Sequence, residues 1–124
     1  MSNQQKVKEF QKAFNSNVGI ASELPDSSER ELRIKLLKEE FEEYIDGENN
    51  NDLVEIADAL GDMLYIIYGT AVSYGIPLEE IFDEIHRSNM SKLGEDGNPI
   101  FREDGKVLKG PNYFKPDISK YLKG

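Results

Sequence analysis

Acidic residues recur at helical spacing in two consecutive stretches of this chain. The two sets are Glu39, Glu40, Glu42 and Glu43 in the first stretch, and Glu55, Asp58 and Asp62 in the second. Positions three, four and seven apart share one face of an α-helix, so each stretch is expected to place several carboxylates on one face. If the two helices pack antiparallel, four or more carboxylates converge. Such a group repels itself unless a divalent cation binds it, and Mg²⁺ or Mn²⁺ suits hard oxygen ligands. The pattern indicates phosphate chemistry.

The first cluster also has a plainer interpretation. Glutamate is a good helix former, and a run such as Glu39–Glu43 is typical of a solvated helix face. Asp62 is different, because aspartate is a poor helix-interior residue and this one precedes a long stretch without charge. Taken together, two carboxylate clusters about twenty residues apart on consecutive helices favour a site over a surface.

Composition excludes several classes of protein. The chain has 124 residues, which predicts a single domain spanning residues 1–124, and it contains no cysteine, so disulfides and thiolate metal sites are excluded. No segment has the pattern of a signal peptide or a membrane span, and a cytoplasmic location is the simplest expectation. The net charge of −9 argues against binding a nucleic-acid polymer.

The charge is unevenly distributed along the chain. Residues 23–62 carry fourteen acidic and four basic residues, a net of −10, whereas residues 86–124 carry eight basic and five acidic residues, a net of +3. The first region could hold a cation, and the second could contact the anion that this cation carries.

Hydrophobic periodicity predicts an all-α fold. We expect helices from about residue 4 to 15, from about 27 to before Gly47, from about 53 to 74 after an Asp52 cap, and from about 78 to 89. Together they form a four-to-five-helix bundle with a helical core of about residues 4–90. Repeated Asp-Gly and Gly-Pro pairs predict an irregular basic tail over about residues 91–124, with a short hairpin near Ile100 and Phe101.

The third predicted helix carries no charged residue between Met63 and Ser73. A helix that is apolar all round is buried all round, so the surface around Ile66 and Gly69 must be covered. A second subunit would cover it, and we expect a homodimer or homotetramer. The aromatic residues of the first and third helices are expected in the core: Phe10, Phe14, Tyr65 and Tyr68.

Two segments resemble a known superfamily. The sequences Leu37-Lys-Glu-Glu-Phe-Glu-Glu and Ala59-Leu-Gly-Asp-Met-Leu-Tyr resemble the all-α nucleoside triphosphate pyrophosphohydrolases, which include MazG-like enzymes, dimeric dUTPases and phosphoribosyl-ATP pyrophosphohydrolase. The segments Ile85-His-Arg-Ser-Asn-Met-Ser-Lys and Asp104-Gly-Lys-Val-Leu-Lys resemble the C-terminal part of a MazG-like subgroup close to dUTPase. The family signature is Glu-x-x-Glu on one helix and Glu-x-x-Asp on the next, which together bind Mg²⁺.

The resemblance assigns metal ligands residue by residue. Its first motif falls on Glu40 and Glu43, and Glu39 before them could bind metal or activate water. The second motif places the family's aspartate at Asp62, but its glutamate falls on Ala59. We expect Asp58 to stand in for that glutamate. The pair Glu55-x-x-Asp58 also spells the motif one turn earlier, which keeps Glu55 as an alternative ligand.

The resemblance also implies the reaction. Mg²⁺ would neutralise the phosphates, a carboxylate such as Glu39 or Glu40 would activate water, and the products would be a nucleoside monophosphate and pyrophosphate. In the C-terminal segment, Asn89, Lys92, Lys106 and Lys109 are the expected substrate-binding residues. They could equally be solvated loop residues. The only histidine, His86, is expected to be structural or solvent-facing.

Three functions remain open from the sequence. The substrate could be an NTP or dNTP, including dUTP-like or non-standard nucleotides, or it could be phosphoribosyl-ATP. In a different class, the protein could be a non-catalytic helical module that binds divalent ions or a partner. An EF-hand is disfavoured, because no Asp-x-Asp-x-Asp-Gly loop ending in glutamate occurs.

Overall fold

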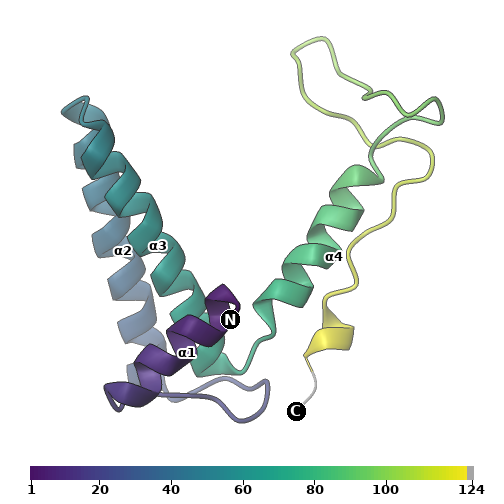
Figure 1. Ribbon diagram of the computed structural model, residues 1–124. Helices are drawn as coiled ribbons and strands as arrows, with labels where there is room; N and C mark the ends of the chain where they lie inside the picture. The colour runs from purple at the N-terminus through teal and green to yellow at the C-terminus, as the bar shows by residue number, and fades with distance from the viewer. Residues whose placement is uncertain (123–124) are drawn as a thin grey trace. The chain divides into compact units, whose positions relative to one another are not determined.

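The computed structural model describes residues 1–122 and shows an all-α protein (Figure 1). The elements follow the order α1 (Asn3–Ala13), α2 (Ser27–Asn49), α3 (Leu53–Tyr74), α4 (Leu78–Met90) and a 3₁₀ turn, η1 (Ser119–Tyr121). Within residues 1–122 the only β-type pairing is a single antiparallel bridge between Phe101 and Val107. None of these helices combines the length and the apolar character needed to cross a membrane.

The chain divides into two compact units, Met1–Pro77 and a second one that begins at Leu78. In the first unit, α2 packs against α3, and α1 packs against α3 (Figure 1). The buried apolar core of this unit is small: Val7, Ala59, Ala71 and Val72.

Side-chain caps fix the starts of the first three helices. Asp26 accepts a hydrogen bond from the Glu29 amide, and Asp52 accepts one from the Glu55 amide, as predicted for Asp52. At α1, Ser2 and Gln5 form a reciprocal capping box. Each cap gives a partner to a backbone N–H that has none within its own helix.

The predicted end of the second helix is wrong. Helix α2 continues to Asn49 instead of ending before Gly47, and Gly47 is buried. A Cβ at Gly47 would lie 3.0 Å from Ile56 Cγ1, so the glycine lets α3 approach α2 closely. The turn after α2 is accordingly short, with Asn51 in the left-handed region at φ 51°.

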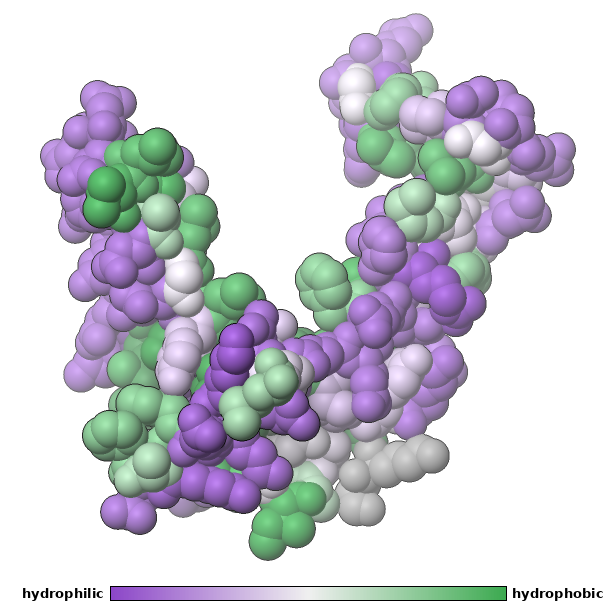
Figure 2. All heavy atoms as spheres, in the orientation of Figure 1, coloured by the Kyte–Doolittle hydropathy of each residue, from purple (hydrophilic) through white to green (hydrophobic). Residues whose placement is uncertain are grey.

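The expectation that the aromatic residues and the apolar stripe of α3 are buried is also wrong for the single chain. Phe14, Leu53 and Leu60 are 67%, 78% and 50% exposed, and other large apolar side chains of α2 and α3 are exposed as well. Figure 2 shows apolar surface at the end of the α2–α3 hairpin. Two helices and a short third one cannot enclose so much apolar surface.

In the second unit, the C-terminal segment is fixed to α4. The buried Glu84 carboxylate accepts a hydrogen bond from the Asp117 amide at 2.8 Å and pairs with Arg87, also at 2.8 Å. The Ser88 hydroxyl donates to the Phe114 carbonyl, and the Arg87 guanidinium lies over the Phe114 ring. These contacts lower the pKa of Glu84, chiefly through the Asp117 amide and then through Arg87.

Candidate active site

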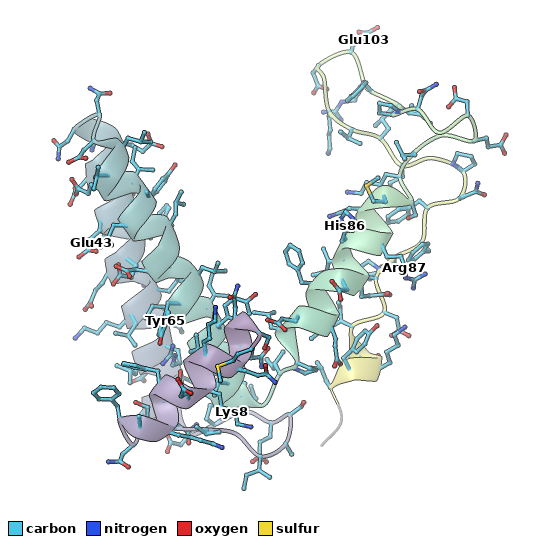
Figure 3. The ribbon with its side chains drawn as sticks, in the orientation of Figure 1. Lys8, Glu43, Tyr65, His86, Arg87 and Glu103 are labelled. Atoms are coloured by element: carbon cyan, nitrogen blue, oxygen red, sulfur yellow. The ribbon has the colours of Figure 1, made fainter. Side chains whose placement is uncertain are left out.

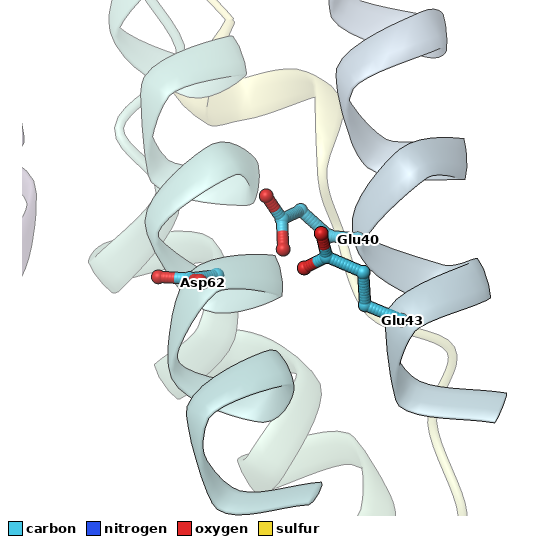
Figure 4. Close-up of side chains that lie close together, drawn as sticks. All are labelled: Glu40, Glu43 and Asp62. Carbon is cyan, nitrogen blue, oxygen red and sulfur yellow. The ribbon is translucent and has the colours of Figure 1, made fainter. Parts of the chain in front are cut away.

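Three carboxylates from α2 and α3 converge in the first unit. One oxygen from each of Glu40, Glu43 and Asp62 lies within 4.8 Å of the others (Figure 4). Glu40 and Glu43 come from one face of α2, because they are three residues apart, and Asp62 faces them from α3. Ala59 on α3 is 1% exposed and brings the helices together beside this cluster without adding a carboxylate.

The environment of Glu40 and Asp62 favours their protonated forms. Burial, the hydrogen bond with Glu43, and repulsion from Glu43, Asp62 and Asp58 raise the pKa of Glu40 to about 7. Burial, followed by repulsion from Asp58 and Glu43, also raises the pKa of Asp62. The cluster therefore stores electrostatic repulsion that a bound cation would relieve.

One oxygen of the cluster has no internal partner. Glu40 Oε2 is buried and accepts no hydrogen bond from residues 1–122. A buried carboxylate oxygen without a donor is costly, whereas an oxygen ligand of a divalent ion needs no donor. Charge, oxygen donors and spacing all fit Mg²⁺ or Mn²⁺, and within the part of the chain that the structure describes no other group of three or more potential ligands has this geometry.

The other acidic candidates lie outside this group of three. Asp58 is exposed and acts on Glu40 and Asp62 through its charge. Glu39 is exposed on α2, and Glu55 lies in the first turn of α3, where its amide donates to the cap residue Asp52. Asp62, and not the pair Glu55 and Asp58 one turn earlier, lies beside Glu40 and Glu43, which is the helix register that the sequence favoured. The roles of Asp58, Glu55 and Glu39 stay predictions.

The candidate substrate-binding residues all belong to the second unit. Asn89 lies in the last turn of α4, and its carbonyl accepts from the Lys92 amide. The Lys92 carbonyl accepts from the Gly110 amide, which ties the start of the tail to its later part. Lys106 lies in the turn beside the bridge of Phe101 and Val107, and Lys109 Nζ lies 4.8 Å from the centre of the Tyr113 ring. Their role as phosphate contacts stays a prediction.

Sequence analysis missed a second polar group, built around Arg33. Only 8% of Arg33 is exposed, and its guanidinium donates to Thr70 Oγ1 at 3.1 Å and to the Ile66 carbonyl at 2.9 Å. Together with Gln11 of α1, it covers the Gly69 face that we expected a second subunit to cover. No local signal could have found it, because Arg30 lies on the same helix and the sequence does not show which of the two arginines is buried.

Comparisons with known proteins agree with this fold and site. Residues 7–89 match the family described as phosphoribosyl-ATP pyrophosphohydrolase. A solved structure from Exiguobacterium sp. 255-15, described provisionally as an NTP pyrophosphohydrolase, is similar with a TM-score of 0.52 and 26% identity, over 94% of this chain and 89% of that chain. An uncharacterized protein of Acanthamoeba polyphaga mimivirus is 34% identical over 111 residues, which are 86% of this chain. The chain spans 42% of the length of that relative.

The all-α fold is similar to that of the Exiguobacterium protein, and it presents converging carboxylates from two antiparallel helices. The chain belongs to the phosphoribosyl-ATP pyrophosphohydrolase family, within the MazG-like all-α superfamily that its motifs resemble. This confirms the family and the all-α fold that we expected.

Proposed function

We propose that the protein is a Mg²⁺-dependent nucleoside triphosphate pyrophosphohydrolase that cleaves an NTP or dNTP, including dUTP-like or non-standard nucleotides, to the monophosphate and pyrophosphate. The cluster of Glu40, Glu43 and Asp62 carries this proposal, because its oxygens lie within 4.8 Å and one of them is buried without a partner. The chain belongs to a family of enzymes of this kind.

Glu40, Glu43 and Asp62 would hold the ion, and Asp58 would add negative charge beside it. When bound, Mg²⁺ or Mn²⁺ neutralises phosphate oxygens and makes the phosphorus more electrophilic. Glu39 is the proposed group that orients or deprotonates the attacking water, since it is exposed next to Glu40 on α2. Glu40 shares this role in the proposal, and Glu55 stays the alternative ligand.

The remaining parts of the proposal concern the substrate and the assembly. Asn89, Lys92, Lys106 and Lys109 are proposed to contact the phosphates, and the exposed apolar surface of α2 and α3 supports a homodimer or homotetramer. The proposed substrate is a free nucleotide and no nucleic-acid polymer, and the proposed location is the cytoplasm.

The decisive experiment is a pyrophosphate-release assay with and without Mg²⁺. The panel contains the common and several damaged nucleotides, and phosphoribosyl-ATP, because the family description favours that compound as a second candidate. We expect release from at least one nucleoside triphosphate, loss of release with EDTA or in Glu43→Gln, and retention in the control Glu42→Gln. If no compound yields pyrophosphate with Mg²⁺ or Mn²⁺, the protein is a non-catalytic binding module instead.

A further inference from the structure

A cavity of about 440 Å³ opens between α1, α2 and α3 in the first unit. Its volume lies within the usual range for small-molecule sites. Its lining combines aromatic walls with a few polar groups, among them Phe10, Gln11, Asn17, Glu29, Arg33 and Tyr65. Neither the metal cluster nor the proposed phosphate contacts use these residues.

The cavity contains a mostly buried cation, Arg33, which forms no ion pair in the described chain although the charge of Glu29 acts on it. Among residues 1–122, no carboxylate forms an ion pair with Arg33. Its Nε and Nη2 atoms donate to protein oxygens, whereas the N–H groups of Nη1 have no partner in the described chain. Burial lowers the pKa of this guanidinium, opposed by the charge of Glu29. An Arg33 donor facing a cavity favours a ligand that supplies an oxygen acceptor.

The surrounding packing holds this guanidinium in place. A Cβ at Gly69 would lie 2.3 Å from Arg33 Nη2 and 2.6 Å from Gln11 Oε1, so a larger residue there would displace the ends of both side chains. Gln11 donates to the Asn17 carbonyl at 2.7 Å, and Ser73 donates to Glu29 at 2.8 Å. These bonds fix the polar end of the cavity before any ligand enters, which lowers the entropic cost of binding.

The aromatic walls suit a flat ligand. The rings of Phe10 and Tyr65 meet edge to face with centroids 5.6 Å apart, and the two residues are 43% and 41% exposed. Tyr65 projects from α3 beside α1 (Figure 3). Exposed aromatic rings beside polar donors are typical of sites that stack a nucleobase.

The cavity lies at a suitable separation from the carboxylates. Arg33 precedes Glu40 by seven residues on α2, roughly 10 Å along the helix axis. Tyr65 follows Asp62 by three residues on α3, roughly 5 Å along the axis. The two helices are antiparallel, so both displacements point the same way. A nucleotide with its phosphates at the carboxylates could therefore extend its sugar and base into the cavity.

We propose that this cavity binds the base of the substrate nucleotide and that Arg33 selects a base with a ring carbonyl oxygen. Arg33 can only donate hydrogen bonds, so at position 6 of a purine it favours a carbonyl acceptor over the amino donor of adenine, whose acceptors are ring nitrogens. This inference rests on the proposed function for the placement of the phosphates, and it deepens that function by naming the class of base. The proposed base preference predicts that adenine nucleotides, including the adenine-derived phosphoribosyl-ATP, are poorer substrates than keto-base nucleotides.

The test compares two ligands that differ mainly at the position Arg33 would read. Inosine monophosphate carries an O6 carbonyl where adenosine monophosphate carries an amino group. We measure binding of both by calorimetry with Mg²⁺ present, in the wild type, in Arg33→Met and in Tyr65→Leu. Arg30→Met is the matched control, because Arg30 is an exposed arginine on the same helix. Circular dichroism and sedimentation establish the fold and assembly of each variant.

We expect the wild type to bind inosine monophosphate about tenfold tighter than adenosine monophosphate, the factor that one good hydrogen bond to a charged donor supplies. Arg33→Met should bring this ratio close to one, and Arg30→Met should leave it unchanged. Tyr65→Leu should weaken both ligands while keeping the ratio, and this variant still tests the cavity if Arg33→Met does not fold.

The inference is overturned if the wild type binds both ligands equally or neither, if the folded Arg33→Met keeps the ratio, or if Tyr65→Leu binds both as tightly as the wild type. A change in assembly without a change in binding would also overturn it, since the cavity would then be a subunit contact. Pyrophosphate release from ITP and ATP separates the two proposals. Turnover without base preference leaves the proposed function intact, whereas Arg33-dependent binding without turnover refutes the proposed function and leaves this inference.

Discussion

Replacing Glu40 with glutamine should stabilise the metal-free protein at pH 8 and should stabilise it less at pH 5. The pKa of Glu40 rises from 4.5 to about 7 in the folded protein because burial and neighbouring carboxylates disfavour the charge. Between pH 4.5 and about pH 7, the Glu40 carboxyl therefore binds more protons in the folded state than in the unfolded state. The free energy of unfolding therefore falls as the pH rises through this window.

The size of this effect follows from the shift. One pKa unit corresponds to about 1.4 kcal/mol, so a rise from 4.5 to about 7 corresponds to a cost on the order of 3 kcal/mol when Glu40 is fully ionised. Glu40 is partly exposed, and solvent screens the repulsion, so we expect roughly 1–2 kcal/mol from removing the charge. For a chain of this size the midpoint of thermal unfolding should rise by about 3–8 °C.

The assay is thermal unfolding in EDTA at pH 5 and pH 8, with Glu42→Gln as the control. Glu42 is exposed on the same helix and lies outside the cluster, so its substitution should change stability by no more than about 0.5 kcal/mol. At pH 5 Glu40 is largely protonated in the folded protein but mostly ionised in the unfolded chain, so only part of the benefit should remain. An equal gain at both pH values, or a loss of stability at pH 8, would refute the electrostatic reasoning.

The same cluster and the remaining surfaces give three further predictions. Asp62→Asn and Glu43→Gln should each fold and should each lose pyrophosphate release. The thermal midpoint of the wild type should rise with Mg²⁺, because a ligand of the native state stabilises it by mass action, and both variants should lose this rise. If Asp62→Asn keeps its Mg²⁺ response, Asp62 is not a ligand and Glu55→Gln is the next variant to test. Replacing Lys92, Lys106 and Lys109 together with alanine should raise KM for the nucleotide while calorimetric Mg²⁺ binding stays nearly constant, and unchanged kinetics would make them ordinary surface residues. Light scattering at micromolar concentration should show a dimer or tetramer, because exposed apolar side chains such as Leu60 and Leu64 are expected to be buried in a subunit interface. A monomer would contradict the proposed assembly.

The sequence by itself determined the class of fold and the core of the site. Helical periodicity and the Asp52 cap are local properties, since they depend on residues within a few positions of each other. The spacing of Glu40 and Glu43 likewise places them on one face of a helix whatever surrounds it. The apolar run after Asp62 marked that residue as unusual, and its convergence with the other two followed once α2 and α3 formed an antiparallel pair.

Only the tertiary structure decided which groups are buried and what they contact. Nothing local separates Arg33 from the exposed Arg30, and the burial of Arg33 arises because Gly69 and Gln11 come from other helices to meet it. The pKa of Glu40 depends on Asp58 and Asp62, eighteen and more residues away along the chain. The end of α2 was mispredicted because glycine is a poor helix former in isolation, whereas close packing against Ile56 favours glycine at position 47. Burial and long-range contacts are properties of the packed helices, so the sequence determined the elements and their packing determined the chemistry of their side chains.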